Sequence, residues 1–138
     1  IGEKPEGYED PSDKVMANLD TVAKTELKRM NVENRRGEVK FEEKGTLEGK
    51  YYKETKVYED YYPLDADASA HTSTGDRGYV GYVEYSYRIY QSPRKTSRTE
   101  AAAASASIAT DVTGRETYRY SFSPGGVWDG AEGERAKR

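Results

Sequence analysis

The longest run of strand-favouring residues in the sequence is Tyr79–Gln91. Successive side chains of a strand point to opposite faces, and the alternate positions of this run are mostly aromatic or aliphatic. The intervening positions mix tyrosine with charge, as at Glu84 and Arg88, which suits a half-wet surface. The run therefore predicts a β-strand with one face in the core. The core-facing set is Tyr79, Gly81, Val83, Tyr85, Tyr87 and Ile89.

The composition permits one domain with a modest core. The 138 residues are 34% hydrophobic, and 13 tyrosines stand against two phenylalanines and one tryptophan, so many core rings carry a hydroxyl that needs a partner. The absence of cysteine excludes disulfides, thiolate catalysis and cysteine-ligated metal centres. The net charge of -3 predicts no nucleic-acid partner. No apolar run approaches the roughly 18 residues of a membrane-spanning helix.

The two ends of the chain lack hydrophobic periodicity. Residues 1–9 are predicted to form a flexible arm and 129–138 a disordered tail, which leaves a single α+β domain over 10–128. A chain that opens with Ile1 fits either a processed mature protein or an excised segment. Tyrosine-rich strands with Gly, Ser and Thr in the loops favour an exported protein, periplasmic or secreted.

A helix is predicted near the start of this domain. Asp10 suits the N-cap and Pro11 the first helical position, where a missing N–H costs nothing. Apolar residues then recur at spacings of three and four, which indicates one amphipathic helix of about five turns. They are Met16, Leu19, Ala23, Leu27 and Met30, with Val15 and Val22 widening the stripe. Gly37 is the natural stop.

After the helix the hydrophobic period changes to two. Residues 38–42 predict a short strand and 50–64 a longer one, whose charges and paired tyrosines indicate an edge or a bulge. Residues 65–78 are predicted to be a polar loop before the Tyr79 strand. A last strand is predicted over 115–123, with alternate residues on one side. These are Glu116, Tyr118, Tyr120 and Phe122.

Residues 96–111 are compatible with two structures. Ala101–Ala104 favours a helix, whereas the Thr, Ser and Ile alternation beyond favours a strand. We expect a strand, because Asp111–Gly114 suits a tight turn that would join it to 115–123 as a hairpin.

One helix followed by four or five antiparallel strands predicts an α+β fold, because the strands follow one another without crossover helices. The simplest packing lays the amphipathic helix across one face of a curved sheet. In element order, over residues 10–128, this layout is similar to the cystatin-like and NTF2-like rolls. Such folds host enzymes, binding domains and scaffolds alike, so the resemblance implies a layout and no functional residue.

The segment from Asp65 to Asp76 spaces its oxygen-bearing side chains as in a calcium-binding loop of the EF-hand type. Ala70 stands where the sharp turn wants glycine, and the last ligand is Asp76 rather than glutamate. We therefore expect no cofactor, with calcium as the alternative. The ligands would be Asp65, Asp67, Ser69 and Asp76.

No catalytic residue is predicted. His71 is the only histidine, and no Gly-x-Ser-x-Gly elbow or phosphate-binding loop accompanies it. Adjacent carboxylates such as Glu42–Glu43 and Glu59–Asp60 point to opposite faces of a strand, so they cannot flank one glycosidic bond. We interpret them as surface charges and expect that the protein is not an enzyme.

Arginine and tyrosine gather in the second half of the chain. Both are enriched in protein–protein hot spots, although they also pack across strands without a ligand. We expect a non-enzymatic accessory protein that docks on a protein partner or multi-subunit assembly through a Tyr/Arg-rich sheet face. The alternative is a small-ligand binder or enzyme with a Tyr-lined pocket between helix and sheet. The predicted partner face comprises Tyr82, Arg88, Tyr90, Arg94, Arg98 and Arg119.

Overall fold

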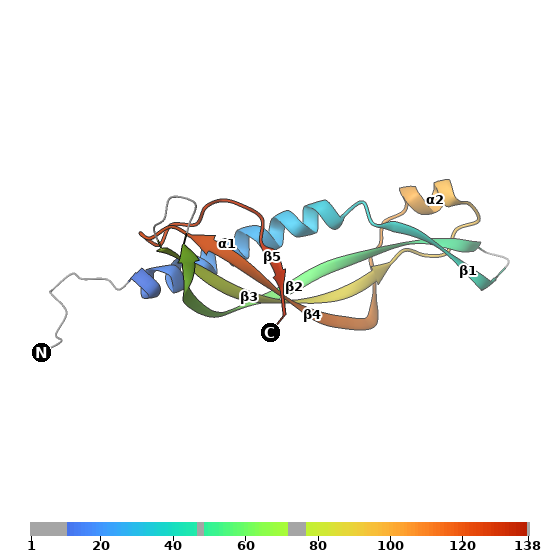
Figure 1. Cartoon of the computed structure of the whole chain (residues 1–138). Coiled ribbons are helices and arrows are strands. Elements are labelled where there is room, and N and C mark those ends of the chain that lie inside the picture. Colours follow the sequence, from blue (N-terminus) through green and yellow to red (C-terminus); the bar gives the residue numbers. More distant parts are fainter. Residues whose placement is uncertain (1–10, 47–48, 72–76, 138) are drawn as a thin grey trace, which may run out of the picture. The chain divides into compact units, whose positions relative to one another are not determined.

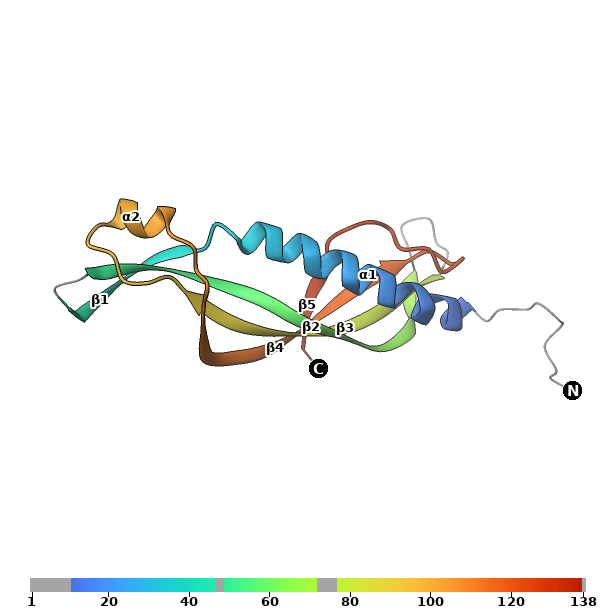
Figure 2. The same ribbon diagram turned by 180° about the vertical axis from the view of Figure 1, so that it is seen from behind.

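The computed structural model of the chain describes residues 11–46, 49–71 and 77–137 (Figure 1). Its elements are α1 (Pro11–Asn34), β1 (Glu38–Thr46), β2 (Gly49–His71), β3 (Arg77–Gln91), α2 (Arg98–Ala103), β4 (Ile108–Phe122) and β5 (Glu134–Ala136). The fold is α+β as predicted, with the N-terminal helix packed on a five-stranded antiparallel sheet of order β1-β2-β3-β4-β5. In the chain the short helix α2 comes between β3 and β4, and in Figure 2, which shows the ribbon from behind, it lies near β1. Neither helix combines the length and hydrophobicity needed to cross a bilayer within the described residues.

Helix α1 confirms the predicted amphipathic helix and is longer than expected, with 24 residues or nearly seven turns. Asp13 places a negative charge in the first turn, favourable to the helix dipole. The chain leaves the helix through Gly37, which has a φ of +64° and donates its N–H to the Asn34 carbonyl at 3.0 Å. Its buried side chains are Val15, Leu19, Val22, Ala23, Glu26 and Met30. The predicted N-cap and the predicted N-terminal arm lie outside the described residues.

Strand β3 confirms the alternation that the sequence predicts. Gly81, Val83 and Tyr85 are buried, while the residues between them are half-exposed. Of the predicted core face, Tyr79, Tyr87 and Ile89 are also half-exposed, so the alternation holds over the middle of the strand only. The partner strand β2 also pairs with β1, where Glu38 lies opposite Glu54 and Phe41 opposite Tyr51.

The chain divides into two compact units. Of the described residues, the first contains 11–26, 61–71, 77–84 and 116–137, and the second contains 27–46, 49–60 and 85–115. Helix α1 and strands β2, β3 and β4 contribute residues to both units.

In the first unit, the helix lies close against β3 at Gly81. A Cβ at this position would stand 2.7 Å from Leu19 Cδ1 and 3.2 Å from a ring atom of Phe122, so the packing requires glycine. The C-terminal segment also contacts this unit, since Trp128 forms an isolated bridge with Phe122 and stacks edge-on against Tyr120 at 6.4 Å. The core thus combines the apolar stripe of α1 with aromatic side chains of β4.

In the second unit, aromatic rings form most of the core. Tyr58 packs edge-on against Tyr85 and Tyr87, with ring centroids 5.7 and 6.2 Å apart. The backbone of Tyr58 is satisfied by a helix side chain, because Asn31 donates to its carbonyl at 2.9 Å and accepts from its N–H at 2.8 Å. Asn34 likewise donates to the Lys56 carbonyl at 3.2 Å. The two asparagine side chains of α1 thereby satisfy backbone hydrogen-bonding groups of β2 at positions that do not pair with β1.

Two predictions about β2 are wrong. The segment 65–71 was expected to lie in a polar loop, but β2 continues to His71. Of the predicted edge or bulge, the edge is wrong because β2 lies between β1 and β3. The register between β1 and β2 does shift, between Phe41 and Thr46. β-propensity depends strongly on neighbouring strands, and β2 has one on each side, so the weak strand preference of the Ala, Asp and Ser residues there is overridden.

The expected strand over 96–111 is confirmed only from Ile108 on, where β4 begins, and the expected hairpin is wrong. Arg98–Ala103 forms α2, whose N-cap Ser97 accepts the Glu100 N–H at 3.1 Å, so the alternative that the alanines favoured is correct. The expected turn Asp111–Gly114 lies inside β4. Gly114 serves close packing there, because a Cβ at this position would overlap the Tyr87 ring.

The C-terminal tail was expected to lack regular structure, but part of it forms β5. Glu134–Ala136 pairs antiparallel with Thr117–Arg119 of β4. The pairing is accompanied by an ion pair between Arg135 and the buried Glu116, 3.2 Å apart. A charged, aperiodic segment is therefore ordered by partners on another strand, which its own pattern does not encode.

Candidate interaction surface

Arg88 and Tyr90 of β3 share one carboxylate on β2. Glu59 accepts from Arg88 Nε at 3.2 Å through one oxygen and from the Tyr90 hydroxyl at 2.7 Å through the other. Arg88 also donates to the Thr110 carbonyl of β4 at 2.7 Å. The Arg88 and Glu59 side chains remain 34% and 39% exposed. Both predicted residues are thus held in place while solvent still reaches them.

The shared carboxylate also sets the protonation of the phenol. The hydrogen bond to Glu59 raises the pKa of Tyr90 above its ordinary value, with desolvation as a further cause. The hydroxyl therefore remains protonated at neutral pH. Because its proton is committed to Glu59, the hydroxyl oxygen stays available as an acceptor at the surface.

A cavity lies between the end of α1 and β2. Lys53 of β2 and Ser92, the residue after β3, are hydrogen-bonded to each other. Counting along the antiparallel strands from this pair places Thr55 opposite Tyr90 and Val57 opposite Arg88. Thr55 and Val57 line the cavity, whose volume is about 220 Å³. Its other lining residues are Asn31, Asn34, Arg35, Lys56 and Ala106. None of Glu59, Arg88 and Tyr90 lines this cavity, and we call these three residues the Arg88 surface.

Arg94 belongs to a different cluster. Its guanidinium lies 3.8 Å from the centroid of the Tyr52 ring and donates to Glu42 at 2.7 Å and to Gln91 at 3.2 Å. The hydrogen bond from Arg94 lowers the pKa of the Glu42 carboxyl. Since Gln91 is adjacent to Tyr90 on a strand, its side chain points to the opposite face of the sheet. Arg94 thus extends away from the Arg88 surface.

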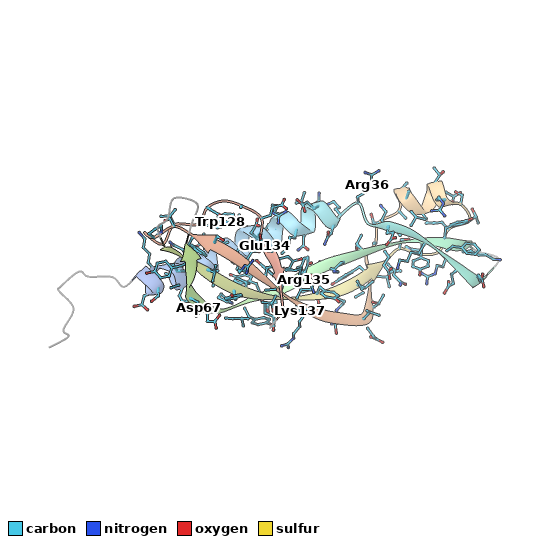
Figure 3. All side chains as sticks on the ribbon, viewed as in Figure 1. Arg36, Asp67, Trp128, Glu134, Arg135 and Lys137 are labelled. Atoms are coloured by element: carbon cyan, nitrogen blue, oxygen red, sulfur yellow. The ribbon has the colours of Figure 1, made fainter. Side chains whose placement is uncertain are left out.

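The other predicted residues are distributed further. Arg98 of α2 lies 5.6 Å from the Tyr51 ring in the second unit. In the first unit Arg119 pairs with Glu134 of β5, which raises the pKa of Arg119, and Tyr82 adds a weaker hydrogen bond. Glu134 and Arg135 are adjacent on β5 (Figure 3). The structure thus brings together two pairs of the predicted face, Arg88 with Tyr90 through Glu59 and Arg119 with Tyr82.

The candidate calcium ligands do not lie in a described loop. Asp65 and Asp67 are on β2, and Asp67 is labelled on that strand in Figure 3. The side chains of Ser69 and Asp76 lie outside the described part of the chain. Within that part, no group of three or more histidines, aspartates and glutamates is arranged to hold a metal ion.

A second cavity, of about 320 Å³, lies between the end of α1 and β2. Arg36, labelled in Figure 3, is one of its lining residues. The full lining is Glu33, Asn34, Arg36, Gly37, Glu38, Glu54, Thr55 and Lys56. The alternative from the sequence was a Tyr-lined pocket between helix and sheet, and no tyrosine lines either of these two cavities.

Sequence reasoning missed the residue that organises the Arg88 surface. Glu59 was interpreted as a surface charge, and its role depends on the register that brings it beside Arg88 and Tyr90. The only signal in the sequence is a carboxylate on one strand and a basic and phenolic pair on the next. Without the register, every carboxylate on the preceding strand is an equally good candidate for the shared partner of Arg88 and Tyr90.

No family model matches the chain, and no curated protein or solved structure matches it either. A functional proposal must therefore be supported by the geometry of the chain's own residues.

Proposed function

We propose that this protein is a non-enzymatic interaction protein that docks on a protein partner through the Arg88 surface. The observation that carries the proposal is the double use of Glu59, which fixes Arg88 and Tyr90 while leaving them accessible. Arginine and tyrosine are the side chains most enriched at energetic hot spots of protein interfaces.

Prior fixing of these side chains favours binding. Immobilising a side chain with many rotamers costs about 0.5–1.5 kcal/mol on association. Arg88 is already held by Glu59 and by the Thr110 carbonyl. Most of the entropic cost of immobilising its side chain is therefore paid in the free protein, before a partner binds.

The alternative is a small-ligand binder using the larger cavity at the end of α1. Its volume of about 320 Å³ is at the lower end of the range of roughly 300–1,000 Å³ typical of ligand pockets. Such pockets are mostly apolar, whereas this lining contains glutamates, an arginine and a lysine. We therefore prefer docking on a protein partner to binding of a small ligand.

Capture from an extract of the native source tests the docking function. Wild-type protein, Arg88→Ala and Tyr90→Ala are immobilised, and captured proteins are quantified by mass spectrometry. We expect one partner whose capture falls by tens of fold in both variants, as for hot-spot truncations of about 2 kcal/mol or more. Tyr90→Phe separates the hydroxyl from the ring.

Arg29→Ala is the matched control, because Arg29 is also an ion-paired arginine with a side chain 30% exposed. Capture should be unchanged in this variant. Thermal melts establish that the variants are folded. If no captured protein depends on both Arg88 and Tyr90, or if both variants melt early and capture normally, the cluster is structural and the proposal is wrong.

A further inference from the structure

The smaller of the two cavities at the end of α1 has a positively charged lining. Its volume of about 220 Å³ is several times the roughly 30 Å³ that one water molecule occupies in the liquid. Its lining residues, all in the second unit, are Asn31, Asn34, Arg35, Thr55, Lys56, Val57 and Ala106. Among these described residues there are two cations and no carboxylate. In a chain with a net charge of -3, such a lining favours a negatively charged ligand.

Thr55 brings an unpaired hydroxyl to this cavity. The residue is only 7% exposed, yet its hydroxyl has no hydrogen-bond partner in the described part of the chain. Among the described residues that are not exposed, the only side-chain nitrogen or oxygen that is both inaccessible and unpaired is Trp128 Nε1, so the Thr55 hydroxyl still reaches open space. Its methyl group is the branch next to Gly37, where a Cβ would stand 2.6 Å from Thr55 Cγ2. A buried hydroxyl without a partner is costly, so a ligand that bonds to it is stabilised.

Arg35 provides an unpaired cation in the same lining. Within the described ranges its guanidinium makes no ion pair or hydrogen bond, whereas Arg29, Arg88 and Arg94 each bond to a carboxylate. The residue directly follows α1, and its backbone N–H is bonded to the Val32 carbonyl at 3.3 Å. A guanidinium is planar and presents its N–H donors as a fork, which matches the oxygens of a carboxylate or phosphate group.

Lys56 adds a second positive charge. Its ammonium nitrogen lies 4.6 Å from the centroid of the Tyr87 ring and 5.9 Å from that of the Tyr58 ring. These rings hold the cation within reach of their electron-rich faces. Lys56 therefore contributes to the local potential and does not have to contact the ligand, which leaves Arg35 and Thr55 as the binding groups.

Negative charge in the larger cavity is largely compensated. The two cavities adjoin, because three residues line both: Asn34, Thr55 and Lys56. Carboxylates in the larger lining would repel an anion nearby. However, Glu33 is paired with Arg29 at 2.6 Å, and Glu54 is paired with Lys40 at 2.7 Å. The remaining carboxylate of this lining, Glu38, is accompanied there by an arginine.

We propose that Arg35 and Thr55 bind a small oxyanion, a phosphate or carboxylate group, in the smaller cavity. The guanidinium donates to one or two oxygens of the anion, and the hydroxyl donates to another. No residue of the Arg88 surface lines this cavity, so the proposal does not depend on the docking function.

NMR titration of the full chain with inorganic phosphate is the first test, with acetate titrated in parallel. A ligand of so few atoms binds weakly, so we expect saturable shifts of the Arg35 and Thr55 amides with a Kd on the order of millimolar. Sodium chloride at matched ionic strength should give no saturable shift. The anion with the lower Kd identifies the preferred group, and equal values mean that either group is accepted. If neither anion exceeds sodium chloride, the proposal is wrong.

Two adjacent arginines provide a matched pair of variants. Arg35→Gln should weaken phosphate binding about tenfold or more, because it removes a charged hydrogen-bond donor. Arg36→Gln removes the same charge one position later, from the lining of the larger cavity, and should change the Kd by less than about twofold. An equal loss in the two variants would show a general effect of net charge and would overturn the proposed site.

Thr55→Val tests the hydroxyl, because valine keeps the shape of threonine. Since the hydroxyl has no partner within the described chain, the melting temperature without phosphate should be unchanged or higher. Phosphate binding should be several times weaker, and Thr55→Ser, which keeps the hydroxyl, should retain it. The role of Thr55 is refuted if Thr55→Val binds phosphate as the wild type does, or if its melting temperature falls by several degrees.

Discussion

The hydrogen bonds between Asn31 and the backbone of Tyr58 make a strong prediction about stability. Asn31→Ala removes both bonds, and each net hydrogen bond contributes about 1 kcal/mol. The stronger helix preference of alanine returns about 0.6 kcal/mol. Unsatisfied backbone groups beside the buried Tyr58 add a cost of about 1 kcal/mol or more. We expect the free energy of unfolding to fall by about 1.5–3 kcal/mol.

Equilibrium urea denaturation measures this loss, and Asn34→Ala is the matched control. That variant makes the same chemical change but removes a single bond, of 3.2 Å, to Lys56. It should cost less than about 1 kcal/mol. Asn31→Asp retains the acceptor for the Tyr58 N–H but sets a carboxylate oxygen against the Tyr58 carbonyl, so it should also destabilise. The reasoning is refuted if Asn31→Ala lies within about 0.5 kcal/mol of wild type, or if Asn34→Ala costs as much.

Two further outcomes are expected. Gly81→Ala should lower the free energy of unfolding by about 1–3 kcal/mol, because its Cβ would stand 2.7 Å from the buried Leu19; a higher melting temperature would contradict this. The pKa of Glu42 is lowered by Arg94, so its contribution to stability is full above the ordinary carboxyl pKa and is lost as the pH falls through the lowered value. An NMR titration should find the Glu42 pKa returning toward its ordinary value in Arg94→Gln, and an unchanged pKa would show that the contact is absent in solution.

Local pattern was enough to predict the helix and the strands whose two faces differ in polarity. The stripe of α1, the alternation of β3 and the buried side of β4 at Glu116, Tyr120 and Phe122 all follow from periodicity. The order of these elements was enough to predict the α+β layout. In each case the burial of one face dominates the free energy, so the spacing of apolar residues along the chain carries the information.

Tertiary structure decided the features that depend on a partner distant in sequence. Gly114 suggested a turn, but it lies within β4 because the Tyr87 ring needs the space of a side chain. Glu59 was indistinguishable from its neighbours until the strand register set it beside Arg88 and Tyr90. Strand order and register are fixed by the total free energy of pairing between whole strands. The local pattern of any one strand does not determine that free energy.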